Sequence, residues 1–389
     1  MTTTDILPDD VDRAVLVGRL HDPDVGGPCV VTLRGELLVD ATASAATVSD
    51  LLERSDPAAV LAAAEGKTWR FDDVARASPG DRDRPHLLAP CDLQVVKACG
   101  VTFARSMVER VIEERAGGDH HRAQAIREEI AGVIGGALSD IVPGSEVAAR
   151  AKAVLIEGGY WSQYLEVGIG PDAEVFTKAP VLSSVGHGAE IGVLAGSEWN
   201  NPEPEIVLAV DSGGGIRGAA LGNDVNLRDV EGRSALLLGK AKDNNASSAI
   251  GPFIRLFDAH FSLDDVRDAE IALTVVGEDG FLLEGHSSMR EISRDPLDLV
   301  AQTCGPNHQY PDGFMLYLGT LFAPTEDRDV PGKGFTHRQG DRVAIASSRL
   351  GRLVNTVSHS HAIAPWDRGI GHLMRNLATR GLLDGRMRQ

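Results

Sequence analysis

The sequence is poor in cysteine, in aromatic residues and in long hydrophobic runs. Its four cysteines show neither CxxC spacing nor the density of a small domain held together by disulfides. No hydrophobic run approaches the roughly 18 residues of a membrane-spanning helix, and the N-terminus lacks the basic and apolar stretches of a secretion signal. We therefore expect reduced cysteines that serve packing, in a cytoplasmic protein without a membrane partner.

Positive charge is also scarce, since 56 acidic residues stand against 38 basic ones and the formal net charge is −18. This balance disfavours nucleic acid and anionic membranes as partners and is compatible with a bound metal ion. Lysine is rarer still, with seven lysines beside 31 arginines. Each lysine merits attention, because an ammonium group shifts its pKa far more readily than a guanidinium.

Apolar residues, in contrast, are plentiful enough for a large core, at 43% of 389 residues. Residues 1–88 alternate short strands and helices, and the polar stretch Ala77–Pro85 predicts a linker near the end of this segment. Helical spacing follows over 103–158, and beyond Tyr160 strands with glycine-rich turns predominate. The sequence predicts an α+β fold, in which a small N-terminal α/β domain (1–88) precedes a mainly β domain (89–389).

Three acidic residues flank a predicted β-hairpin. Apolar runs on both sides of the glycine-rich turn Asp211–Gly215 are typical of two antiparallel strands. With this turn at the centre, Glu205 faces Leu221. Asp224 then ends beside Glu203 and Glu205, which project from one face of their strand because they are two residues apart.

Carboxylates this close repel one another, so either one pKa rises or a cation neutralises them. A set of oxygen ligands without histidine or cysteine favours Mg²⁺ over zinc, with Mn²⁺ or Ca²⁺ as substitutes. The alternative is a hairpin end with its acids in water, but the third acid at the matching position favours a metal site. Lys242 follows a stretch of helical spacing that returns the chain to this end of the sheet. It is either a general acid or base beside the metal or a surface lysine on a loop.

These residues, in this order, resemble the fumarylacetoacetate hydrolase superfamily. The matching motifs are Glu203-Pro204-Glu205, Gly222–Asp229, Lys242 ahead of Ile250-Gly251-Pro252, Gly100–Ser106, Glu174–Pro180, Gly319-Thr320, Gly340–Val343 and Leu350–Asn355. The resemblance covers about residues 96–358. It implies a distorted β-roll, Mg²⁺ bound by Glu203, Glu205 and Asp224, an active-site lysine at Lys242, and substrates that are 2-oxo acids or β-diketo acids. Dimers are usual in the family, so a homodimer or homotetramer is expected.

One departure from the hydrolase motif narrows the choice between the reactions that the superfamily catalyses. Hydrolases of the superfamily carry a histidine, paired with a glutamate, that activates water for C–C cleavage. Ser106 takes that position here and cannot act as the base. The Val101–Ser106 pattern resembles instead the sugar-acid dehydratase branch, the 2-keto-3-deoxy-pentonate dehydratases, and the 2-keto-3-deoxy-D-xylonate type in particular. The implied activity is a hydro-lyase of pentose catabolism, such as D-xylose degradation, which converts 2-keto-3-deoxy-xylonate or -arabinonate to 2-oxoglutarate semialdehyde.

Such a dehydration removes a C3 proton to give an enolate and expels the C4 hydroxyl, so an acid and a base must flank the C3–C4 bond. The resemblance assigns these tasks to Lys242 and Glu174 without deciding which is acid and which is base. An exposed acid at the end of a strand is the alternative for Glu174. Four further residues are candidates for contacts with the substrate carboxylate and hydroxyls, namely Lys178, Arg105, Ser106 and Thr320. Helix-cap or salt-bridge roles stay open for Arg105 and Ser106.

Two other interpretations stay open beside the dehydratase. The protein is then either a hydrolase of an acylpyruvate or diketo acid, with another histidine as base, or a non-catalytic protein that binds a 2-oxo acid. Of the remaining histidines, His187 lies in a glycine turn, and His359 and His361 lie outside the family motifs. All three are interpreted as structural.

Overall fold

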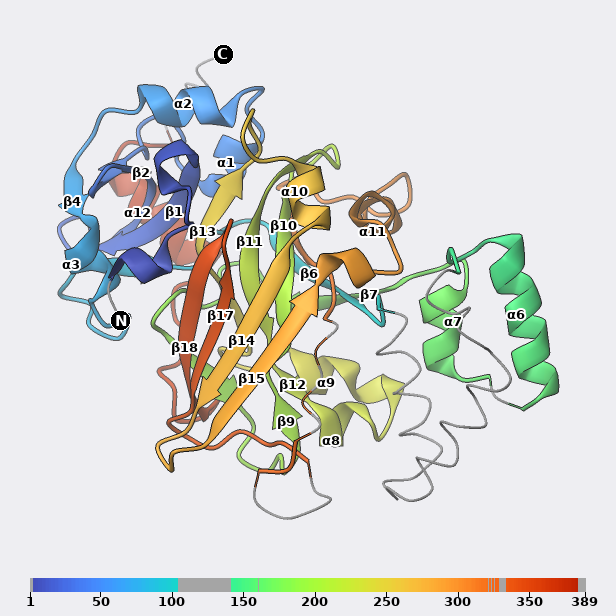
Figure 1. Ribbon diagram of the computed structural model, residues 1–389. Coiled ribbons are helices and arrows are strands. Elements are labelled where there is room, and N and C mark those ends of the chain that lie inside the picture. Colours follow the sequence, from blue (N-terminus) through green and yellow to red (C-terminus); the bar gives the residue numbers. More distant parts are fainter. Residues whose placement is uncertain are drawn as a thin grey trace.

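The computed structural model describes residues 3–103, 141–159, 161–320, 322, 324, 326–328 and 334–383 (Figure 1). The strands are β1 (Leu16–Asp22), β2 (Gly27–Arg34), β3 (Leu37–Asp40), β4 (Thr68–Arg70), β5 (His86–Leu88), β6 (Val95–Gly100), β7 (Glu174–Ala179), β8 (Glu190–Val193), β9 (Asn200–Asn201), β10 (Pro204–Val210), β11 (Ile216–Asp224), β12 (Asn226–Leu227), β13 (Ser248–Leu256), β14 (Glu270–Val276), β15 (Leu282–Ser288), β16 (Phe314–Tyr317), β17 (Arg342–Ser347) and β18 (Gly351–His359). The helices are α1 (Val48–Leu52), α2 (Pro57–Ala63), α3 (Phe71–Ala75), α6 (Glu146–Glu157), α7 (Gln163–Ile169), α8 (Arg228–Glu231), α9 (Leu238–Lys242), α10 (Leu263–Arg267), α11 (Pro296–Thr303) and α12 (Ile370–Thr379). Four short 3-10 turns complete the described elements, namely η1 (Thr3–Ile6), η2 (Val11–Arg13), η4 (Ala235–Leu237) and η5 (Met289–Glu291).

Two large sheets pack face to face and form the body of the molecule. The first has the strand order β4-β3-β2-β1-β13-β11-β10-β16-β6-β7, with β5 paired to β1, and the second has the order β15-β14-β17-β18-β8. Figure 1 shows β14, β15, β17 and β18 lying across β10, β11 and β13. Between the sheets lies a core to which both contribute, for example Ile206 and Leu221 from the first and Leu273 and Ile345 from the second. The mainly β architecture predicted beyond Tyr160 is therefore confirmed.

The N-terminal segment continues the first sheet. β1 pairs antiparallel with β13, with Leu16 opposite Arg255. The Arg255 side chain is buried and forms an ion pair with Asp10, 2.6 Å between Nη1 and Oδ1. The strands and short helices expected before residue 88 are present, and their hydrogen bonds run without a break into the β-roll. The domain boundary at 88 stays a prediction.

The hairpin that carries the acidic residues forms as predicted, with one difference in register. β10 and β11 are antiparallel neighbours, but an irregularity between Ala209 and Val210 shifts the pairing by one residue. Glu205 therefore faces Gly222, and the predicted pairing with Leu221 is wrong by one position. A local bulge next to a tight turn leaves no clear signal in the residue pattern, since glycines fill that turn in either register.

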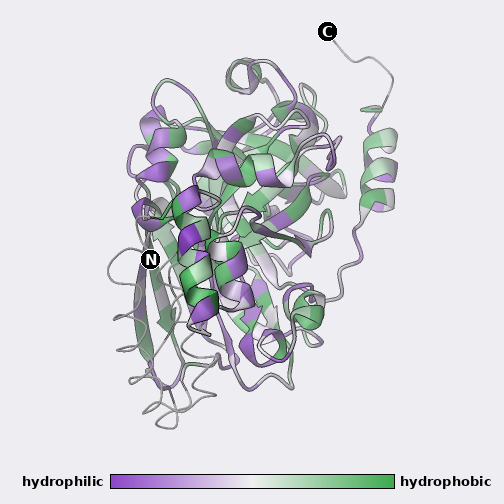
Figure 2. Ribbon diagram, turned by 90° about the vertical axis from the view of Figure 1, so that its right-hand side faces the viewer, coloured by the Kyte–Doolittle hydropathy of each residue, from purple (hydrophilic) through white to green (hydrophobic). Residues whose placement is uncertain are grey.

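Most helices lie on the outside of the two sheets. Figure 2 shows helices banded in both hydrophobic and hydrophilic colours, as expected when only one side of a helix is packed. Helices α6 and α7 extend to one side of the sheets in Figure 1. Helix α6 falls within the predicted helical range 103–158, of which residues 104–140 lie outside the described residues. None of the described helices is long and apolar enough to cross a membrane.

Candidate metal centre

Three buried carboxylates converge at one end of the β10–β11 hairpin. Glu203 directly precedes β10, Glu205 is its second residue, and Asp224 ends β11. All three side chains are buried, and one oxygen of each lies within 4.8 Å of the others. The convergence predicted from the spacing of these acids is therefore present in the structure.

The backbone around the hairpin end fixes these side chains. The Asp224 N–H donates to the Glu203 carbonyl oxygen (3.0 Å), and the Glu203 N–H donates to the side-chain oxygen of Asn223 (3.1 Å). The Gly319 N–H, just beyond β16, donates to Glu205 Oε2 (2.7 Å). Gly319 has a positive φ of 89°, and a Cβ there would lie 2.1 Å from Thr102 Oγ1. Only glycine therefore brings this N–H so close to the carboxylate.

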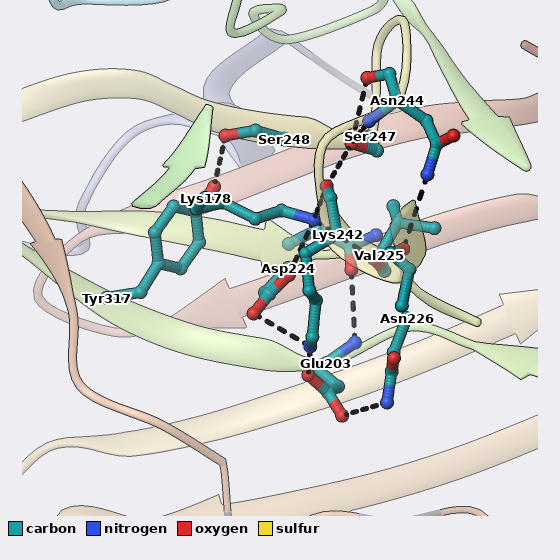
Figure 3. A network of polar contacts seen from close by, with 12 residues as sticks. Lys178, Glu203, Asp224, Val225, Asn226, Lys242, Asn244, Ser247, Ser248 and Tyr317 are labelled. Atoms are coloured by element: carbon teal, nitrogen blue, oxygen red, sulfur yellow. Dashed lines mark hydrogen bonds and ion pairs between the residues drawn. The ribbon is translucent and has the colours of Figure 1, made fainter. Parts of the chain in front are cut away.

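Two of the seven lysines meet these carboxylates (Figure 3). Lys242, the last residue of α9, places Nζ 2.6 Å from Glu203 Oε2 and 3.0 Å from Asp224 Oδ2. Lys178, on β7, places Nζ 2.7 Å from Asp224 Oδ1 and also donates to the carbonyl oxygens of Val225 and Lys242. Both lysine side chains are buried. The short helical turns of α8, η4 and α9 return Lys242 to this end of the sheet, as the sequence predicts.

The three carboxylates and two ammonium groups are buried together, and they shift one another's pKa values. Burial, and then the charges of Asp224 and Glu203, raise the pKa of Glu205 well above its usual value. Burial is thus the largest cause of the higher pKa of Glu205, and the neighbouring carboxylates add to it. Burial alone would lower the pKa of Lys242, but Asp224 and Glu203 outweigh it and raise that pKa. A neighbouring divalent ion would have the opposite effect on Lys242.

The donor set fits a hard divalent cation. It consists of carboxylate oxygens alone, it is buried, and the carboxylates outnumber the ammonium groups by one. Mg²⁺, Mn²⁺ and Ca²⁺ prefer oxygen ligands, whereas zinc favours histidine and cysteine. Glu203, Glu205 and Asp224 are therefore the residues that could hold such an ion.

Strand β7, which carries Lys178, carries two further side chains of interest. Glu174 and Phe176 are two residues apart and share one face of the strand, and the pairing with β6 shifts by one residue at Lys178. Lys242 Nζ lies 5.7 Å from the centre of the Phe176 ring. The half-buried Glu174 lies over the end of β6, because a Cβ on Gly100 would be 2.1 Å from Glu174 Oε2. The structure thus brings the candidates Lys178 and Glu174 to the side of the sheet that carries Lys242.

The other predicted substrate contacts have different outcomes. Thr320 is half-buried and follows Gly319, whose N–H binds Glu205. Its Oγ1 accepts a hydrogen bond from the Phe322 N–H (3.1 Å), so it closes a turn next to the carboxylates. Arg105 and Ser106 lie outside the described residues.

Two residues of this network were not predicted. The buried Asn226 amide donates to Glu203 Oε1 (3.0 Å) and to Glu231 Oε2 (2.7 Å), and thereby positions a ligand carboxylate. The buried Tyr317 hydroxyl donates to the Ala249 carbonyl oxygen (2.8 Å) and lies 3.0 Å from Ser248 Oγ. Asn226 stands within the motif Gly222–Asp229, so its polar side chain beside an apolar strand was a usable signal. Tyr317 comes from a distant segment and carried no such signal.

The histidines interpreted as structural keep to the backbone or the surface. The His187 ring is buried, and its Nδ1 accepts a hydrogen bond from the Val354 N–H (3.2 Å) on β18. Burial lowers the pKa of His187 to about 4. His359 and His361 stack with ring centres 5.6 Å apart. These contacts agree with the structural interpretation.

Comparison with characterised proteins gives relatives of one kind. The chain is 31% identical over 190 residues to a 2-dehydro-3-deoxy-D-arabinonate dehydratase of Saccharolobus solfataricus, covering 49% of this chain and 60% of the relative. It is 29% identical over 195 residues to a probable 2-keto-3-deoxyxylonate dehydratase of Haloferax volcanii, covering 50% of this chain and 63% of the relative. The chain therefore matches less than two thirds of the length of either relative.

The fold has counterparts among solved structures. A 2-keto-3-deoxy-D-arabinonate dehydratase in its apo form superposes with a TM-score of 0.61 at 21% identity, over 88% of this chain and 99% of the other. The same values hold for a 2-keto-3-deoxy-D-arabinonate dehydratase complexed with magnesium and 2,5-dioxopentanoate. Residues 129–358, more than half of the chain, match the family model described as fumarylacetoacetate (FAA) hydrolase C-terminal. The chain therefore belongs to the fumarylacetoacetate hydrolase family.

Proposed function

We propose that the protein is a divalent-metal-dependent dehydratase that converts a 2-keto-3-deoxy-pentonate to 2-oxoglutarate semialdehyde. The observation that carries the proposal is the buried cluster of Glu203, Glu205 and Asp224, with Lys242 in contact with two of its members. Both curated relatives are named as dehydratases of this substrate class. One similar structure contains magnesium together with 2,5-dioxopentanoate, which is another name for 2-oxoglutarate semialdehyde.

Each group has a task that its position supports. A Mg²⁺ ion held by Glu203, Glu205 and Asp224 would polarise the 2-oxo group of the substrate and acidify its C3 protons. Lys242 lies against the ring of Phe176, which is two residues from Glu174 on β7, and Lys242 and Glu174 are the proposed acid and base for the C3–C4 bond. Thr320, beside the carboxylates, is proposed to contact a substrate oxygen.

The position of Lys178 favours a structural task over a direct contact with the substrate. Its side chain has no exposed surface, and its ammonium group is held by Asp224 and two backbone carbonyl oxygens. We propose that it fixes the Asp224 carboxylate and screens part of the negative charge. The substrate carboxylate is then left to groups nearer the opening of the site, for which Arg105 and Ser106 stay candidates.

Product analysis by NMR tests the function. The purified protein is incubated with 2-keto-3-deoxy-xylonate, 2-keto-3-deoxy-arabinonate or an acylpyruvate, each with Mg²⁺ and with EDTA. We expect semialdehyde from at least one keto-deoxy-pentonate, only with Mg²⁺, and no cleavage of the acylpyruvate. Pyruvate release from the acylpyruvate would establish the hydrolase instead. Binding of these compounds to the protein without conversion of any of them would indicate a binding protein.

A further inference from the structure

A cavity of about 380 Å³ lies apart from the metal centre. Three parts of the chain enclose it: the N-terminal stretch 78–89, the stretch 182–190 with Asn245 and Ala246, and the C-terminal stretch 363–373, which we call the C-terminal arm. None of the three proposed metal ligands and neither active-site lysine lines it. Its volume is within the range of small-molecule sites, about 300–1,000 Å³.

The lining carries three arginines, Arg19, Arg82 and Arg368, against the two carboxylates of Glu190 and Asp367, in a protein of net charge −18. Arg82 is already paired, since its two terminal nitrogens lie 2.9 and 3.0 Å from the two Asp367 oxygens. Arg19 is committed to the carbonyl oxygens of Ala89 and Cys91. Arg368 differs from both, because its Nη1 donates to the ring nitrogen of His21 (3.0 Å).

Arg368 therefore has no ion-pair partner at the cavity among the described residues, although the charge of the adjacent Asp367 acts on it at longer range. Within the described part of the chain, no carboxylate lies at ion-pair distance from its guanidinium. Burial, and then the nearby charge of Arg82, lower the pKa of Arg368. A half-buried guanidinium with free donors and a cationic neighbour is an anion-binding group, and it matches carboxylate or phosphate geometry.

A second polar group at the cavity also lacks a partner. His372, four residues after Arg368 on the arm, has a buried Nε2 atom that forms no hydrogen bond with any described residue. Buried polar atoms of this kind are rare, because an unmade hydrogen bond costs free energy. The rest of the lining is largely apolar, with Leu88, Val185 and Leu373 and the ring of Trp366.

We propose that this cavity binds a small organic anion, whose carboxylate or phosphate group pairs with Arg368 and His372 and whose apolar body packs against the Trp366 side of the lining. The charged group accepts from the remaining N–H groups of Arg368 and pairs with His372 Nε2, and the apolar body fills the remainder of the cavity. This site is separate from the proposed substrate site, because it needs no metal ion and recognises no 2-oxo group.

Calorimetric titration of the full chain in EDTA tests the site, because chelation removes metal-dependent binding at the carboxylate cluster. The probes are benzoate, phenyl phosphate and inorganic phosphate. We expect saturable binding of at least one aromatic anion below about 10 mM, and binding of inorganic phosphate at least about tenfold weaker than that of phenyl phosphate, because it lacks the apolar body.

Matched variants on the arm locate the site. Arg368→Gln and His372→Leu should each weaken binding of the aromatic anion by about tenfold or more. Arg375→Gln changes a residue of helix α12 outside the lining and should bind the anion as the wild type does. Thermal unfolding without ligand confirms that all variants are folded. No saturable binding of either aromatic anion, or equal affinities in Arg368→Gln and Arg375→Gln, would overturn the proposal.

Discussion

At the residue scale, the described acids and lysines of the centre form one charge network. Asp224 contacts both Lys178 and Lys242, while Glu203 contacts Lys242 and the Asn226 amide. Glu205 instead accepts from the Gly319 N–H. The two lysines therefore compensate two of the three carboxylates, and the third is the one whose pKa burial and its neighbours raise. A divalent ion bound by the three carboxylates would supply the positive charge that this arrangement lacks.

Isotope exchange can decide which of Lys242 and Glu174 is the acid and which is the base. In deuterated buffer, the residue that removes the C3 proton is required for deuterium to enter C3, even when the C4 hydroxyl cannot leave. We expect Lys242→Met and Glu174→Gln both to reduce dehydration at least about 100-fold, since a general acid or base contributes factors of that order. NMR should show that only one of them still exchanges C3. Full turnover in either variant would contradict its proposed role.

His187 gives the stability of the protein a dependence on pH. Its folded pKa is about 4 because the ring is buried, against 6.5 for an ordinary histidine. The neutral ring is the folded form, so its stabilising effect is full above pH 6.5 and is lost as the pH falls toward 4. We expect the free energy of unfolding to fall by up to about 3 kcal/mol over this interval. Urea unfolding at several pH values measures it.

The control for this effect is a histidine that stays in water. His187→Asn should remove its share of the fall between pH 6.5 and 4 and leave the part due to His21, whose pKa burial also lowers to about 4. The substitution His308→Asn, at an exposed residue, is the control and should leave the profile as it is. Identical profiles for the wild type and His187→Asn would show that this ring is not the group responsible.

At the element scale, the edge of the first sheet positions the proposed acid and base. β6 ends at Gly100, and β7 begins at Glu174 directly opposite. A side chain at Gly100 would occupy the position of the Glu174 carboxylate, since its Cβ would come within 2.1 Å of Oε2. The absence of a side chain at Gly100 therefore leaves the space that the Glu174 carboxylate occupies at the end of β6.

Gly100→Ala tests this positioning. The added methyl group must displace the Glu174 carboxylate, so we expect kcat to fall about tenfold or more while Mg²⁺ affinity stays unchanged, because no metal ligand is touched. Gly305→Ala is the control, since a Cβ there meets nothing within 4 Å. Steady-state kinetics and a Mg²⁺ titration give both quantities. An unchanged kcat in Gly100→Ala would mean that Glu174 does not act from this position.

Much of the centre could be predicted because its ligands lie on one local hairpin. The two-residue spacing of Glu203 and Glu205 and the turn before Asp224 are readable from sequence alone. The bulge beside Val210 escaped prediction, because glycines hide the register. Tyr317 escaped it as well, because its contacts with Ser248 and Ala249 depend on strands far apart in the chain.

At the scale of the whole molecule, one sheet runs from the N-terminal segment into the β-roll. β1 pairs with β13, and the buried Arg255 of β13 binds Asp10 of the N-terminal segment. The C-terminal helix α12 returns to the same segment, where Asn376 donates to the Val25 carbonyl oxygen (2.7 Å) and Arg380 to that of Pro28 (2.8 Å). Residues 1–88 are thus attached through backbone pairing and through Asn376 and Arg380 in and next to helix α12.

This continuity predicts cooperative unfolding. We expect a single calorimetric transition for the full chain, because separating β1 from β13 would expose an edge strand and part of the core. Arg255→Leu should lower the transition temperature of the whole molecule, since Asp10 loses its buried partner and keeps only the longer contact with Arg349. Two resolved transitions, with only the first affected by Arg255→Leu, would show that residues 1–88 unfold as an independent domain.

Titration with Mg²⁺ tests the carboxylate centre most directly. Isothermal calorimetry on the full chain should show one ion per chain. Glu205→Gln and Asp224→Asn should each weaken Mg²⁺ binding at least about tenfold. Glu157→Gln, which alters an exposed acid on α6, should leave the Mg²⁺ affinity unchanged. Loss of Mg²⁺ affinity confined to the two ligand variants is the predicted result. Equal Mg²⁺ affinities in all four proteins, or no measurable binding in the wild type, would contradict it.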